Sequence, residues 1–184
     1  LVLDEADRML DMGFGDAIDD IVGRIAKHHQ TLLFSATYPE AIRAASRRLQ
    51  REPVEVTVKT PAEATPAIEQ QFIEVEPAQK LDALAQLLAA GHEQHALVFC
   101  NMRKDVDTVA QELDRRGFSA LALHGDMEQR DRDEVLVRFA NRSCNVLVAT
   151  DVAARGLDIA ALPQVISYDI AHDPDTHTHR IGRT

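Results

Sequence analysis

The sequence predicts an α/β fold built from parallel, doubly wound sheets, and three observations carry that prediction. First, short strand patterns alternate with helical patterns, as they do where each helix connects two parallel strands. Second, most of the strand patterns are continuous apolar runs, which is typical of strands covered by helices on both faces. Third, polar clusters follow several of the predicted strands, at the sheet edge where ligands gather in such folds.

The expected elements follow from the spacing of apolar residues. Strands are expected at residues 1–3, 31–34, 54–58, 70–75, 96–100, 119–123, 145–149 and 164–168. Helices are expected at 77–90, 103–116 and 127–141. A further amphipathic helix begins near Asp16, with Ile18, Ile21, Val22 and Ile25 on one face. Pro39 is expected at the first position of another helix.

Residues 59–67 separate two parts of the chain. The stretch contains two prolines and no bulky apolar side chain, so neither a helix nor a strand is expected there. We therefore expect the end of a first domain at 1–58, a linker at 59–67 and most of a second domain at 68–184. Since the chain lacks an initiator Met and stops on Thr184 without a tail, we interpret it as an internal fragment of a longer protein.

Composition narrows the class of protein. Hydrophobic residues make up 45% and charged residues 27%, as in soluble globular chains, and no apolar run approaches the ~20 residues that span a bilayer. Cys100 and Cys144 lie in apolar runs, so we expect buried thiols in a reduced, cytoplasmic protein without a membrane partner. The net charge of −10 disfavours a general polyanion binder, although most basic residues are arginines, which suit bidentate contact with phosphate.

The segment Asp4-Glu5-Ala6-Asp7 follows the first predicted strand and resembles a Walker B arrangement. A carboxylate at the end of a strand can hold Mg²⁺ through water, because Mg²⁺ keeps most of its hydration shell. The next carboxylate can orient the attacking water in phosphoryl transfer. The same acids would also suit a loop or the N-terminus of a helix, so the tetrapeptide alone leaves both interpretations open.

Five further motifs follow in order, at residues 35–37, 97–101, 124–132, 150–158 and 179–183. Together with the acidic segment they resemble motifs II to VI of the DEAD-box RNA helicases of superfamily 2, over essentially the whole chain. Residues 38–42, 68–72 and 128–143 most resemble the bacterial DbpA type, which is linked to ribosomal RNA. The resemblance implies RecA-like domains, ATP and Mg²⁺ as cofactors, and RNA as the partner.

The resemblance also implies roles at the nucleotide. Asp4 would hold Mg²⁺ through water, and Glu5 would set up the attacking water. Asp158 would accept a hydrogen bond from the ATP ribose. Arg183 would be an arginine finger that reaches the γ-phosphate when the two domains close, and Arg180 is expected on the same interdomain face as a further catalytic residue.

Other positions would couple the nucleotide to RNA. Ser35 and Thr37 would contact Asp7, and these three residues with His179 would link the nucleotide site to strand separation. The residues implied at the RNA-binding face are Phe99, Gln129, Arg132, Thr150 and Gly156. Contacts to the phosphate and sugar carry no base information, so binding without sequence preference is expected.

Two alternatives stay open. A superfamily 2 motor acting on DNA, or of the DEAH type, is disfavoured by Asp7, where that type has His, and by residues 35–37. A catalytically inactive RNA-binding clamp is disfavoured by Glu5 and Arg183. No Gly-x-x-x-x-Gly-Lys-Ser/Thr loop occurs, so we expect that loop in a missing N-terminal half of the parent helicase. The isolated chain is therefore expected not to hydrolyse ATP.

Overall fold

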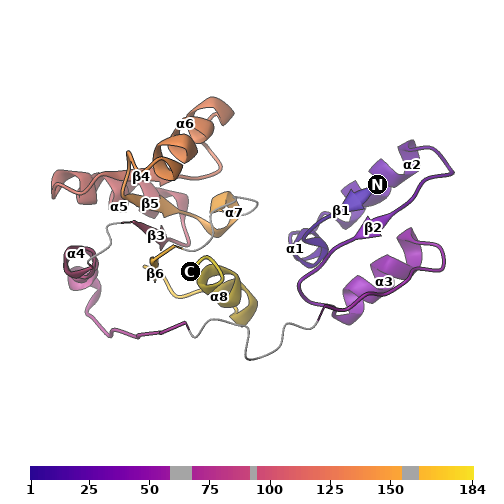
Figure 1. The fold of residues 1–184 in the computed structure, drawn as a ribbon, viewed down its shortest axis with the longest axis horizontal. Coiled ribbons are helices and arrows are strands. Elements are labelled where there is room, and N and C mark those ends of the chain that lie inside the picture. Colours follow the sequence, from indigo (N-terminus) through magenta and orange to yellow (C-terminus); the bar gives the residue numbers. More distant parts are fainter. Residues whose placement is uncertain (59–67, 92–94, 155–161) are drawn as a thin grey trace. The chain divides into compact units, whose positions relative to one another are not determined.

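The computed structural model describes residues 1–58, 68–91, 95–154 and 162–184 (Figure 1). By its internal contacts the chain divides into two compact units, Leu1–Thr65 and Pro66–Thr184. The predicted linker at 59–67 lies outside the described residues.

The first unit contains a short parallel sheet with helices (Figure 1). Strand β1 (Val2–Leu3) pairs in parallel with β2 (Leu32–Leu33). The helices are α1 (Ala6–Asp11), α2 (Gly15–Arg24) and α3 (Glu40–Leu49). The buried apolar side chains of this unit are Leu3, Ala6, Ile18, Ile42 and Ala45. A crossover between two parallel strands therefore places the segments that follow β1 and β2 at the same end of the sheet.

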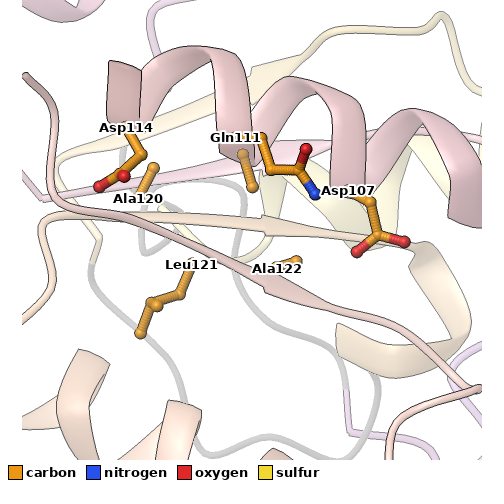
Figure 2. Close-up of a pocket in the computed structure, with 7 residues that line it drawn as sticks. Asp107, Gln111, Asp114, Ala120, Leu121 and Ala122 are labelled. Atoms are coloured by element: carbon orange, nitrogen blue, oxygen red, sulfur yellow. The ribbon is translucent and has the colours of Figure 1, made fainter. Parts of the chain in front are cut away.

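The second unit contains a four-stranded parallel sheet in the order β4-β5-β3-β6. The strands are β3 (Ala96–Phe99), β4 (Ala120–Leu123), β5 (Val146–Ala149) and β6 (Gln164–Ser167). The helices are α4 (Lys80–Ala90), which follows a 3₁₀ turn at Pro77–Gln79, α5 (Arg103–Arg115), α6 (Gln129–Ala140), α7 (Asp151–Ala154) and α8 (Pro174–Ile181). Among the described strands β4 is at one edge, and Figure 2 shows it beside α5.

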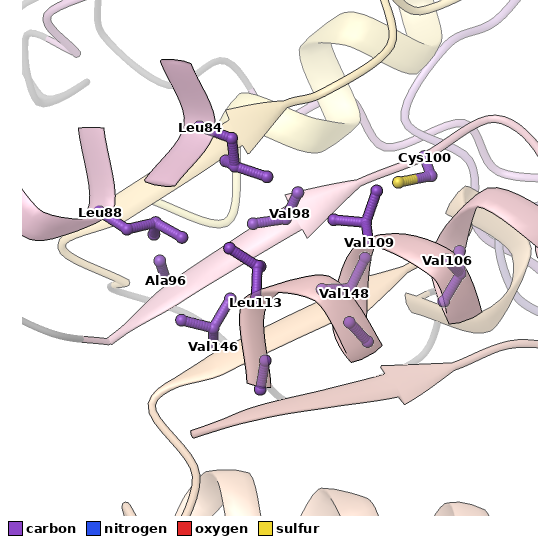
Figure 3. Close-up of a cluster of buried hydrophobic side chains, with 12 residues drawn as sticks. Leu84, Leu88, Ala96, Val98, Cys100, Val106, Val109, Leu113, Val146 and Val148 are labelled. Carbon is purple, nitrogen blue, oxygen red and sulfur yellow. The ribbon is translucent and has the colours of Figure 1, made fainter. Parts of the chain in front are cut away.

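Both faces of this second sheet are covered by helices. Figure 3 shows the cluster on one face, where Val98 of β3 packs with leucines and valines of α4 and α5. On the other face Leu97 and Phe99 of the same strand pack with side chains of α6 and α7, among them Phe139. Successive residues of a strand point to opposite faces, so an apolar run is buried on both sides. The predicted doubly wound α/β architecture is confirmed.

The two cysteines are buried and free, as predicted. Burial raises the pKa of the Cys100 thiol to about 12 and also raises that of Cys144. Neither thiol is ionised at neutral pH, so both are chemically inert in the folded chain. In the part of the chain that the structure describes, every helix is too short or too polar to cross a bilayer.

The strands expected at 96–100, 119–123, 145–149 and 164–168 are confirmed to within one residue. The strands expected at 54–58 and 70–75 are wrong, because neither segment pairs with a described strand. Val54, Val56 and Val58 are 88%, 79% and 85% exposed. A strand needs a neighbour for its backbone hydrogen bonds, and no described residue pairs with these segments.

The helices also depart from expectation in details. Pro39 is the extended N-cap residue of α3 rather than its first helical residue. Ile21 of α2 is 50% exposed although its spacing placed it on the apolar face. The short helices α1, α7 and α8 were not predicted. A signal for α8 existed, since Asp173 caps the Thr176 N–H and Pro174 opens the helix.

Candidate functional site

Asp7 joins the segment after β1 to the segment after β2. Its carboxylate accepts hydrogen bonds from the Thr37 N–H at 2.9 Å and the Thr37 hydroxyl at 2.8 Å. The Ser35 hydroxyl accepts from the Asp7 N–H at 3.3 Å and donates to the Thr37 carbonyl at 2.7 Å. The contact of Asp7 with Ser35 and Thr37 is thus present. The coupling role of these residues stays a prediction.

The electrostatics of Asp7 favour its ionised form. The residue is 4% exposed, and burial by itself would raise the pKa of the carboxyl group. The hydrogen bonds from Thr37, together with the Arg8 N–H at 3.0 Å and the contact with Ser35, outweigh burial and lower the pKa below 3.8. Asp7 is therefore a charged, hydrogen-bonded link between the two strand ends at neutral pH.

Asp4 and Glu5 place two carboxylates directly after β1. Asp4 is exposed, and its Oδ1 accepts the Glu5 N–H at 2.9 Å. Glu5 caps α1 in the left-handed region, with φ 49° and ψ 45°. Such a conformation costs a non-glycine residue roughly 1–2 kcal/mol, and backbone outliers of this kind cluster at functional sites. Exposed carboxylate oxygens at a strand end suit a hard cation that keeps its water, so these residues fit Mg²⁺.

Arg180 is buried among residues of the second unit. This guanidinium is 1% exposed and lies over the Phe99 ring, 5.0 Å from its centroid. Its Nε and one terminal nitrogen donate to the two Asp151 carboxylate oxygens at 2.7 and 2.8 Å. The terminal nitrogens also donate to the Asn101 side chain at 2.8 Å and the Asp169 carbonyl at 2.6 Å. Four hydrogen bonds and the contact with Phe99 hold Arg180 inside the second unit, and its expected role as a catalytic residue stays a prediction.

Sequence reasoning missed the partners of Arg180. Asp169 accepts from Lys80 at 2.5 Å through one oxygen and from the Asn101 N–H at 3.0 Å through the other. Asp151, Asn101 and Asp169 each follow a strand closely, at the ends of β5, β3 and β6. The rule that polar residues gather at strand ends singles out Asn101 and Asp151, and it could also have found Asp169. That these residues bind the guanidinium of Arg180 could be learned only from the tertiary fold.

The residues implied at RNA have different surroundings. Phe99 is 1% exposed, so its ring can support an RNA-binding face only from beneath. Thr150 is also buried, and its hydroxyl accepts from the Ala153 N–H at 3.3 Å at the start of α7. Gln129 is exposed and donates to Asp133 at 2.7 Å. The Nε of Arg132 is buried and has no hydrogen-bond partner among the described residues.

The remaining predicted positions lie near the end of the chain or outside the description. His179 is half-buried on α8, and Arg183 is half-buried just beyond that helix. The Arg183 N–H donates to the Arg180 carbonyl at 3.2 Å, and the Arg183 carbonyl accepts from the Leu162 N–H at 2.9 Å. Gly156 and Asp158 lie outside the described residues.

Comparison with known proteins places these features in a family. The model of the helicase conserved C-terminal domain matches residues 79–184, and that of the DEAD/DEAH box helicases matches residues 1–45. The chain is 56% identical over 184 residues to the ATP-dependent RNA helicase DbpA of Escherichia coli (strain K12), covering all of this chain and 40% of that protein. It is 44% identical over 184 residues to CshA of Bacillus subtilis (strain 168), covering 37% of that protein.

Solved structures give the same result. Dbp5 of S. cerevisiae bound to RNA and ADP BeF3 matches with a TM-score of 0.82 and 33% identity, over 100% of this chain and 49% of that one. A DEAD box protein from the hyperthermophile Methanococcus jannaschii matches with a TM-score of 0.62 and 38% identity. The match covers 100% of this chain and 49% of that protein. The chain thus spans less than half the length of these relatives.

These matches first define a class, the helicases with RecA-like α/β domains, and so confirm the predicted fold class. Within that class, the chain belongs to the DEAD-box family of RNA helicases. The predicted resemblance to the DbpA type is also confirmed by the identity to the E. coli protein.

Proposed function

We propose that the protein containing this chain is an ATP-dependent RNA helicase that couples ATP hydrolysis to local separation of RNA duplexes. The observation that carries the proposal is the bonding of Asp7 to Ser35 and Thr37, which ties the acidic segment after β1 to the segment after β2. The printed names of DbpA and CshA, both ATP-dependent RNA helicases, support the same activity, as does the Dbp5 structure with RNA and ADP BeF3.

Asp4 and Glu5 form the nucleotide side of this proposal. Asp4 holds the water shell of Mg²⁺, and the exposure of its carboxylate supports that role. Glu5 orients and polarises the attacking water, which its position next to Asp4 supports. Bound Mg²⁺ supplies neutralisation of the charge on the ATP phosphates. Asp158 accepts a hydrogen bond from the ATP ribose.

Hydrolysis in this proposal depends on both units. Arg183 is the arginine finger, a contribution worth about 10³–10⁵ in rate. The carboxylates belong to the first unit and the finger to the second, so turnover requires the two units to close around ATP. RNA that binds both units favours closure. RNA binding and nucleotide binding are thereby linked by a coupling free energy. The residues that carry this coupling are Asp7, Ser35, Thr37 and His179.

The second unit supplies the proposed RNA contacts. Gln129, Arg132, Thr150 and Gly156 lie near the RNA backbone, and Phe99 packs beneath that face. The exposure of Gln129 at the start of α6 supports a contact with RNA there. Backbone contacts give no sequence preference.

The identity to DbpA supports a finer proposal, that the substrate is ribosomal RNA during ribosome assembly. The buried, free thiols suit the reducing cytoplasm, where we place the protein. In the full-length protein, ribosomal RNA should stimulate phosphate release more than an unrelated duplex of equal length. Equal stimulation by the two RNAs would refute the ribosomal assignment, and stimulation by DNA alone would favour the DNA motor.

Glu5→Gln in the full-length protein tests the enzyme assignment. The amide cannot polarise water as a carboxylate does, so RNA-stimulated phosphate release should fall by about 10²-fold or more while RNA affinity is retained. Glu55→Gln is the matched control, because Glu55 is exposed in the same unit and has no proposed role. If wild type, Glu5→Gln and Glu55→Gln are equally inert but bind RNA, the protein is a clamp.

The isolated 184-residue chain is proposed to be inactive, because its sequence lacks a phosphate-binding loop. Without the backbone N–H groups of that loop, no cradle positions the phosphates of ATP. Phosphate release by the purified chain, measured with and without RNA, should equal the blank. RNA-stimulated release above the blank would contradict this proposal.

A further inference from the structure

A hollow lies between α5 and the edge of β4 that pairs with no other described strand. Its volume is about 270 Å³, and Figure 2 shows one face of α5 on one side and β4 on the other. The residues of α5 that line it are Ala110 and the polar Asp107, Gln111 and Asp114. The three polar residues are spaced i, i+4, i+7, so they form one stripe along the helix. The β4 residues are Ala120, Leu121 and Ala122.

The edge of β4 offers unpaired backbone groups. Among the described strands β4 pairs with β5 alone. On the β5 side, the Ser119 carbonyl accepts from the Val146 N–H at 3.0 Å, and the Leu123 carbonyl accepts from the Thr150 N–H at 3.3 Å. Backbone groups of successive strand residues point to opposite sides, so the N–H and C=O of Ala122 point to the free edge. These two backbone groups can start the pairing of an added strand, whereas the Ala120 N–H already donates to the Phe118 carbonyl at 2.9 Å.

The stripe on α5 gives this edge a negative charge. Asp107 and Asp114 lie near opposite ends of the hollow in Figure 2, with Gln111 between them. One Asp107 oxygen accepts from Nε2 of His124 at 3.0 Å, and Asp114 is exposed, with no ion-pair partner in the described part of the chain. Seven residues of helix span about 10 Å, so the carboxylates extend along the length of the edge.

This charge selects among possible occupants. RNA is disfavoured, because its phosphates would face two carboxylates. A second copy pairing through the same edge is also disfavoured, since an isologous contact would bring the two acidic stripes together. A basic polypeptide segment satisfies both features, because its backbone can pair with β4 and its side chains can reach the carboxylates.

We propose that the β4 edge and the Asp107–Asp114 stripe bind an extended, basic segment of a partner protein by β-strand addition. A strand rises about 3.3 Å per residue and repeats its facing side chains every two residues. Basic side chains about four residues apart, on flexible stems, then match carboxylates about 10 Å apart. Ala122 is half-buried and carries only a methyl group, so no long side chain at this position blocks an added backbone.

The probe is a synthetic nine-residue peptide in which valine and threonine alternate, except that lysine replaces two of these residues about four positions apart. It is titrated into the full ¹⁵N-labelled chain at low salt. We expect amide shifts confined to β4 and α5, and slower hydrogen exchange of the Ala122 amide. The variant D107N/D114N should bind about tenfold more weakly. The matched control D131N/E134Q removes two exposed charges from α6 and should stay within about twofold of wild type.

A second peptide separates strand addition from simple charge attraction. N-methylation of its central amides keeps both lysines but removes the donors that a strand needs, so binding should be lost. Equal binding of the methylated peptide, equal binding by D107N/D114N, or no binding to wild type would each overturn the proposal. Protection of Ala122 that rises with protein concentration alone would assign the edge to a second copy instead. Spectra unchanged outside β4 and α5 show that the variants are folded.

Discussion

Replacing Arg180 by methionine tests whether the buried guanidinium holds the second unit together. Methionine keeps an unbranched apolar stem but removes all donors. The Asp151 carboxylate, the Asn101 side chain and the Asp169 carbonyl would lose the hydrogen bonds of 2.6 to 2.8 Å that they accept from Arg180. Removing one partner of a buried ion pair costs about 3–5 kcal/mol, because the other charge is left uncompensated.

Urea unfolding followed by circular dichroism measures this loss. With a slope of about 2 kcal/mol per molar urea, a loss of about 4 kcal/mol lowers the midpoint by about 2 M. Arg115→Met is the control, because Arg115 is 66% exposed where it pairs with Glu112, and such pairs contribute about 0–1 kcal/mol. Arg180→Lys should give an intermediate loss, since an ammonium cannot form the bidentate contact with Asp151.

The result that refutes this reasoning is a midpoint for Arg180→Met equal to that of Arg115→Met. The double variant Asp151→Asn/Arg180→Met gives a second check. Because the two residues share one interaction, the combined loss of unfolding free energy should be smaller than the sum of the single losses. Strict additivity would show that the pair in the structure carries no coupling.

Three further outcomes are expected. The pKa of Asp7 is lowered from 3.8, so the stabilisation by its ionised carboxylate is present above about pH 4 and is lost as pH falls through the folded-state pKa. The urea midpoints at pH 7 and pH 3 should therefore differ less in Asp7→Asn than in wild type. Cys100 and Cys144 should not react with a thiol reagent at pH 8 in the folded chain, and both should react in urea, whereas a thiol that reacts at once would contradict their burial. Phe139→Ala should lower the unfolding free energy by about 3–5 kcal/mol, and a loss under 1 kcal/mol would show that this side of the sheet is loosely packed.

The strand predictions held best where an apolar run is covered on both faces. Strands such as 96–100 and 145–149 are apolar runs covered on both faces, so local pattern and tertiary burial agree there. In the first unit the alternation at 54–58 fits a strand, but the segment is unpaired. Strand pairing depends on a neighbour that can lie far away in the sequence, so the periodicity of a segment does not predict it.

The candidate site divides in the same way. The sequence by itself determined the family, the acidic segment at Asp4 to Asp7 and the order of the motifs, because residue types and spacing are local facts. Only the tertiary structure showed which residues surround Arg180. Arg180 lies in a motif that predicts a position on the interdomain face, and residues far away in the chain, Asn101 and Asp151, bind its guanidinium. Burial depends on which strand ends meet, and parallel pairing through crossovers sets that at long range.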